Sequence, residues 1–222
     1  MFNEAFLWQK RVMKSEAFSS TAHRYARKDW SDEKNKSVYG DFFSREGLGH
    51  NFRLVLELNS NVESANPALD LVRKIDHKFL DESEAYFSGR VSSLENITEF
   101  LFAEALKLWP KVLVSIEVFE GETLSCLRTM KGLMLKKLFR TRSSETVYDV
   151  EIMFGGAIDL ESGLILARPY IKDIEQQHLS AITQAVLGEL LLGSIASRCT
   201  IISVDVRNAL DKSLIKSLRL LD

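Results

Sequence analysis

The chain has 222 residues, of which 45% are hydrophobic and 27% are charged, as in an ordinary globular protein. A formal net charge of -2 argues against a dedicated nucleic-acid-binding protein, which would usually be basic. No apolar run approaches the ~18 residues of a membrane-spanning helix, and the first residues lack the pattern of a signal peptide. Cys126 and Cys199 suggest no disulfide framework. These features predict a cytoplasmic protein with no membrane or nucleic-acid partner.

The first half of the chain shows two strand patterns, two helix patterns and two further strand patterns, with a charged loop at 30–35. Asn66 can cap a helix that has Pro67 in its first turn, and we expect this helix to extend to His77. The run Ser92-Ser93-Leu94-Glu95 is typical of a capping box at the start of the second helix. The predicted strands span 6–25, 52–58, 112–120 and 123–128.

The second half repeats this order. Two strand patterns at 133–141 and 148–154 are followed by a predicted hairpin at 155–165. Two predicted helices at 170–181 and 184–196 come next, and two closing strands at 200–206 and 214–220 end the unit. The sequence therefore predicts an α+β fold made of two tandem ββααββ units, residues 1–131 and residues 132–222. Each unit would form an antiparallel sheet with its helices on one face.

A polar loop leads from Tyr39 into the second strand. Gly47 and Gly49 allow the backbone to bend sharply just before that strand, so His50 lies at its mouth. A histidine in this position can be a metal ligand or a polar residue at the rim of the sheet. The residues of the loop alone leave both interpretations open.

The loop resembles the zinc-site loop of the 6-pyruvoyl- and 6-carboxy-tetrahydropterin synthase family, whose unit is called the T-fold. In that family Tyr-Gly-x-Cys runs into His-Gly-His-Asn-Tyr, and Tyr39-Gly40 and Gly49-His50-Asn51-Phe52 keep the pattern. Phe42 stands where the family has its cysteine base, and Leu48 stands where it has the first histidine of His-Gly-His. Glu46 is a candidate substitute for that missing ligand.

Three further motifs carry the resemblance. His23 matches the zinc histidine that ends the family's first strand, so the resemblance implies that His23 and His50 bind zinc. The run from Ile75 to Asp81 is similar to Leu-Asp-His-x-x-Leu-Asp, which implies proton transfer by Asp76 and His77. Glu120 matches a strand-end glutamate, which implies that it accepts two N–H bonds from a pterin.

The implied function is that of a zinc-dependent carbon–oxygen lyase acting on dihydroneopterin triphosphate. The alternative is a non-catalytic protein that binds a pterin, a purine or a protein partner, with His23 and His50 as polar remnants.

Glu95 is accounted for by the capping box and receives no chemical role. The second unit has Asn208 in place of the glutamate and a lone His178 on a helix, so we expect it to be a scaffold. Open sheet edges predict a homo-oligomer joined by edge pairing.

Overall fold

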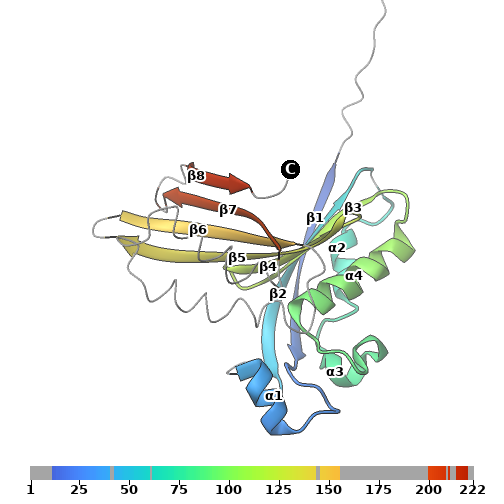
Figure 1. The fold of residues 1–222 in the computed structure, drawn as a ribbon. Coiled ribbons are helices and arrows are strands. Elements are labelled where there is room, and N and C mark those ends of the chain that lie inside the picture. The colour runs from blue at the N-terminus through green and yellow to red at the C-terminus, as the bar shows by residue number, and fades with distance from the viewer. Residues whose placement is uncertain are drawn as a thin grey trace, which may run out of the picture.

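A computed structural model of the chain describes residues 12–40, 43–60, 62–143, 146–155, 200–208, 210 and 214–219 (Figure 1). These residues form one eight-stranded antiparallel sheet in which each strand pairs with the next along the chain. The strands are β1 (Met13–His23), β2 (Leu48–Leu58), β3 (Leu113–Glu120), β4 (Leu124–Thr129), β5 (Gly132–Ser143), β6 (Thr146–Gly155), β7 (Thr200–Asn208) and β8 (Leu214–Arg219). The predicted α+β class is confirmed. The sheet is continuous, however, because β4 pairs with β5.

The helices are α1 (Asp32–Tyr39), α2 (Pro67–Val72), α3 (Leu80–Ser83), η2 (Ala85–Phe87) and α4 (Leu94–Leu108). Helix α2 packs against β1 and β2, and α4 packs against β3 and β4 (Figure 1). Side chains alternate between the two faces of a strand, so Leu54, Leu56 and Leu58 all point to the face under these helices. All three are buried. We call this face the helix-covered face.

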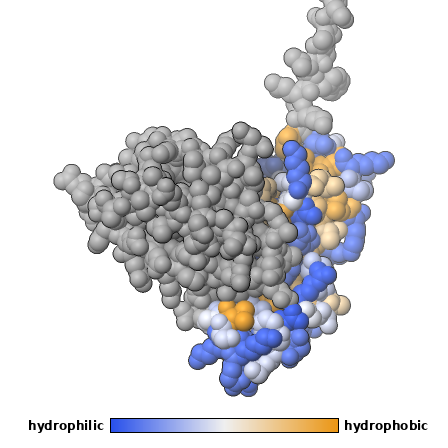
Figure 2. Space-filling view, in the orientation of Figure 1, coloured by the Kyte–Doolittle hydropathy of each residue, from blue (hydrophilic) through white to orange (hydrophobic). Residues whose placement is uncertain are grey.

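The predicted charged loop at 30–35 is wrong in part, because α1 begins at Asp32. Ser31 caps this helix by accepting a hydrogen bond from the amide of Lys34, and two acidic residues follow in the first turn, where the helix dipole favours them. Asn35 is buried and hydrogen-bonds both the amide and the carbonyl of Arg27. The surface over α1 is mainly hydrophilic (Figure 2), as expected for a helix whose sequence has no apolar stripe.

The prediction that the first helix extends to His77 is also wrong. Helix α2 starts as expected, with Asn66 capping the amide of Leu69, but it ends at Val72. The following segment lies along the outer edge of β1 instead: His77 donates its amide hydrogen to the carbonyl of Ser20, and Ala22 donates to the carbonyl of Lys78. Turn-like bonds continue as far as the amide of Asp76, which donates to the carbonyl of Val72, and the bonds to β1 begin at His77.

Strands β5 to β8 confirm the strand positions predicted for the second half of the chain. The predicted hairpin at 155–165 and the two predicted helices at 170–181 and 184–196 lie outside the described residues, as do Phe42 and His178. In the described part of the chain, no helix is both long enough and apolar enough to span a membrane.

Candidate metal centre

His23, His50 and Glu120 come from three adjacent strands and meet at one end of the sheet. In the strand register His50 pairs with Thr21, two residues before His23, and Glu120 pairs with Phe52, two residues after His50. The period of two along each strand therefore turns all three side chains to the helix-covered face. One ligand atom from each residue lies within 4.8 Å of the others.

An acceptor oxygen lies against Nδ1 of each imidazole ring. Nδ1 of His23 is 2.6 Å from the carbonyl oxygen of Ser92, and Nδ1 of His50 is 3.2 Å from Oε1 of Glu120. Both partners accept hydrogen bonds, so each Nδ1 carries the proton and each Nε2 keeps its lone pair. Both Nε2 atoms are buried and have no hydrogen-bond partner among the described residues. Two buried lone pairs thus lack a donor among the described residues, on rings whose centroids are 4.8 Å apart.

Burial keeps these imidazoles neutral. Desolvation, together with the nearby His50, lowers the pKa of His23 to about 4. Desolvation also lowers the pKa of His50. A metal ion binds the neutral form of histidine, so neither ring needs to lose a proton for binding at pH 7.

The donor set fits a divalent metal such as zinc. Two histidines and a glutamate are one of the sets that hold catalytic zinc, with a fourth position left for water or substrate. Leu48 faces His23 across the strand pair and has no ligand atom. The candidate substitute Glu46 is exposed and does not belong to the group. Glu120, predicted to bind a pterin, is the residue that completes the group.

Asp76 and His77 form a pair on the turn after α2. Oδ2 of Asp76 is 2.9 Å from Nδ1 of His77, and Oδ1 accepts a hydrogen bond from the amide of Ser20. That amide is the main reason why the pKa of Asp76 is lowered. His77 has a φ of 55°, in the left-handed region that few non-glycine residues adopt, and its backbone amide is held by Ser20.

The structure does not bring His77 into the group of His23, His50 and Glu120. Its side chain is 82% exposed. It instead lines a pocket of about 440 Å³ together with His50, Ser20, Asn51, Lys78 and Phe79. The proton-transfer candidate and one metal-ligand candidate therefore face a common space.

Glu95 is a residue of the site that the sequence reasoning missed. Ser93, not Ser92, caps α4, so Glu95 is the second residue of the helix and is only 1% exposed. Burial raises its pKa to about 7, and Glu120 contributes in the same direction. Its Oε2 has no hydrogen-bond partner among the described residues. The spacing of seven residues from Glu95 to the buried Phe102 was a signal that Glu95 faces the core.

No family model matches the chain. Human 6-pyruvoyl tetrahydrobiopterin synthase is 28% identical to it over 127 residues, 51% of this chain and 87% of the human protein. The same enzyme from Poecilia reticulata is 30% identical over 103 residues, 41% of this chain and 70% of that protein. A solved structure of Caenorhabditis elegans 6-pyruvoyl tetrahydropterin synthase, 22% identical, has a TM-score of 0.47 and covers 54% of this chain and 94% of that one.

Fold and site together define an α+β protein with a candidate metal centre of two histidines and a carboxylate at one end of an antiparallel sheet. The sequence similarity to the curated relatives then identifies the family. The chain belongs to the tetrahydropterin synthase family.

Proposed function

We propose that the chain is a metal-dependent pterin-binding protein that acts as a carbon–oxygen lyase on dihydroneopterin triphosphate. The observation that carries this proposal is the pair of buried Nε2 atoms of His23 and His50, which have no hydrogen-bond partner among the described residues. The two histidines form a group with Glu120 in which one ligand atom of each residue lies within 4.8 Å of the others. The curated relatives named 6-pyruvoyl tetrahydrobiopterin synthase support the choice of reaction.

In this proposal His23, His50 and Glu120 hold the metal, and the metal supplies Lewis acidity toward an oxygen of the substrate. His77 moves a proton at its Nε2, since its Nδ1 lies against Asp76. The carboxylate of Asp76 fixes the tautomer of the ring. The pocket that His50 and His77 line gives the substrate side chain access to both groups.

Pterin binding needs an acceptor for two parallel N–H groups, a role that a carboxylate can fill. Glu120 has one oxygen 3.2 Å from His50, so part of its acceptor capacity is used. Glu95 is buried, and Glu120 lies close enough to it to contribute to its raised pKa. Its Oε2 has no hydrogen-bond partner in the described part of the chain. We therefore include Glu95 with Glu120 as a pterin-binding residue.

Leu48 favours a second candidate function. The family has a histidine at this position, and leucine cannot bind a metal. A non-catalytic protein that binds a pterin, a purine or a protein partner would keep His50 and Glu120 without needing that histidine. Turnover of dihydroneopterin triphosphate by the zinc-loaded chain distinguishes the two candidates.

We further propose that residues 1–131 and 132–222 are two tandem T-fold units, the second a scaffold, and that chains assemble through pairing of sheet edges. The same order of strands in β1–β4 and β5–β8 supports the tandem arrangement. Light scattering tests the assembly, since a monomer at micromolar concentration would contradict it.

Metal content is the direct test of the site. We expect the wild-type chain, produced with zinc in the medium, to carry close to one zinc per chain by mass spectrometry. His23→Ala and His50→Ala should lose it. His77→Gln is the matched control, because it removes an exposed histidine outside the group: it should keep zinc and lose turnover. Equal zinc content in all four proteins would contradict the proposed site.

A further inference from the structure

Ser92 connects the candidate metal centre to a buried carboxylate. Its carbonyl oxygen receives the Nδ1 proton of His23 at 2.6 Å, and its hydroxyl donates to Oδ2 of Asp81, also at 2.6 Å. The same hydroxyl oxygen accepts a hydrogen bond from the amide of Arg24, the residue after His23. Ser92 is 0% exposed, so water does not compete for these bonds.

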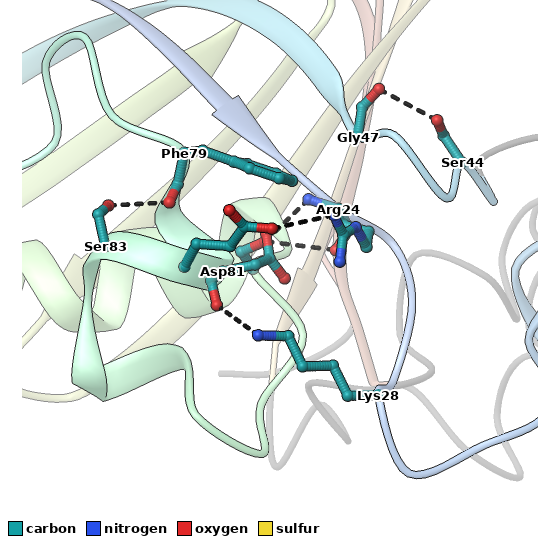
Figure 3. Close-up of polar contacts among 9 residues, drawn as sticks. Arg24, Lys28, Ser44, Gly47, Phe79, Asp81 and Ser83 are labelled. Carbon is teal, nitrogen blue, oxygen red and sulfur yellow. Dashed lines mark hydrogen bonds and ion pairs between the residues drawn. The ribbon is translucent and has the colours of Figure 1, made fainter.

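Asp81 is itself held in place. It lies in α3, is 7% exposed, and its backbone carbonyl accepts a hydrogen bond from Nζ of Lys28 (Figure 3). Arg24 lies beside it with its guanidinium 4.7 Å from the centre of the Phe79 ring. At Gly47 a Cβ atom would come within 2.8 Å of that ring, so the packing around Phe79 is tight. Asp81 is therefore a fixed acceptor for Ser92.

We propose that Asp81 and Ser92 are positioning residues that set the tautomer and orientation of His23 for metal binding. The Asp81 carboxylate holds the Ser92 hydroxyl, and this holds the Ser92 carbonyl against Nδ1 of His23. Nε2 of His23 is then the lone pair presented to His50 and Glu120. Outer partners of this kind orient metal-ligating histidines and raise their affinity. The inference rests on the proposed metal site, and it adds residues that the loop motif does not contain.

Four substitutions in the full-length chain test this role. Ser92→Ala and Asp81→Ala break the connection, whereas Asp81→Asn keeps an acceptor for the Ser92 hydroxyl. Ser115→Ala is the matched control, because Ser115 is also buried and donates to a carboxylate, that of Glu57 at 3.0 Å, in a pair that does not contact His23. Competition with a chromophoric chelator measures zinc affinity. We expect Ser92→Ala and Asp81→Ala to bind zinc roughly tenfold to a hundredfold more weakly. Asp81→Asn and Ser115→Ala should bind close to wild type.

A second readout needs no metal. Nitrogen-15 NMR of the metal-free chain reports which ring nitrogen of His23 carries the proton. Wild type, Ser115→Ala and Asp81→Asn should show it on Nδ1, and Ser92→Ala and Asp81→Ala should show a mixture of tautomers. Unchanged zinc affinity and an unchanged tautomer in Asp81→Ala would overturn the inference.

The two proposals fail in different ways. If wild type binds no zinc, the proposed metal site fails, and the tautomer comparison still decides whether Asp81 and Ser92 orient His23. If Ser92→Ala does not fold, the comparison of Asp81→Asn with Asp81→Ala decides the question, because these two differ in the acceptor for Ser92.

Discussion

Nδ1 of His50 lies 3.2 Å from Oε1 of Glu120, although β2 and β3, which carry them, are separated in the chain by α2, α3 and α4. The contact places the glutamate beside His50, and both belong with His23 to the candidate metal centre. A residue expected to serve only the pterin is therefore connected to the metal ligands.

Replacement of Glu120 by glutamine tests that connection. Glu120→Gln keeps the shape of the side chain but removes its charge and one acceptor. A hydrogen bond to a charged group is worth ~1.5–3 kcal/mol, so we expect pterin binding to weaken roughly tenfold to a hundredfold. Zinc affinity should fall as well. Calorimetry of wild type and variant with biopterin, and separately with zinc, measures both, and equal values for the two proteins would rule out a role for Glu120.

Leu48→His should strengthen metal binding. Leu48 pairs with His23 across β1 and β2, so a histidine there would add a third imidazole beside the existing two. Leu69→His is the control, since Leu69 is 38% exposed on α2. We expect a higher zinc affinity only for Leu48→His, measured by chelator competition.

Adding Phe42→Cys to Leu48→His rebuilds the family motif and should raise lyase activity. A double variant whose lyase activity is no higher than that of wild type would favour the non-catalytic alternative.

The neutral state of His23 should appear in the acid stability of the metal-free chain. Its pKa is lowered from 6.5 to about 4, so the unfolded chain binds the proton more tightly than the folded one. The free energy of unfolding should therefore decrease as pH falls from 6.5 to 4, by up to about 3 kcal/mol at 1.36 kcal/mol per pKa unit. Urea denaturation at several pH values measures this. The decrease should be smaller in His23→Gln, and an equal decrease in this variant and the wild type would contradict the burial argument.

For Glu95 the free energy of unfolding depends on pH in the opposite direction. Burial raises its pKa from 4.5 to about 7, so the folded chain holds the proton more tightly, and the free energy of unfolding decreases as pH rises between these values. At pH 8.5, Glu95→Gln should be more stable than wild type by up to about 3 kcal/mol, with little difference at pH 4. Pterin binding should nevertheless weaken. The exposed Glu63→Gln is the control, and a Glu95→Gln chain less stable than wild type at pH 8.5 would contradict the burial argument.

Local patterns in the sequence were sufficient for most of the elements. Alternating residues predicted β2 and β6, and Asn66 before Pro67 predicted the start of α2, because strand alternation and helix capping depend only on neighbouring residues. The resemblance to the tetrahydropterin synthases, confirmed by the curated relatives, was visible in short motifs for the same reason. Those motifs named His23, His50 and Glu120 before their positions in space were known.

Contacts between distant segments decided the rest. Helix α2 does not reach His77, because the backbone from His77 to Lys78 hydrogen-bonds β1 instead, and no local signal marks that pairing. The sheet is continuous because β4 pairs with β5, which strand patterns alone do not specify. The buried carboxyl of Glu95 and the Asp81–Ser92–His23 connection depend on burial and on partners far along the chain. The same holds for the Nε2 atoms of His23 and His50, which have no partner within the described ranges. By itself the sequence determined that His23, His50 and Glu120 are candidates, because short motifs carry them. The tertiary structure decided that these three meet and that Glu95 is buried, because burial and long-range contacts depend on the whole fold.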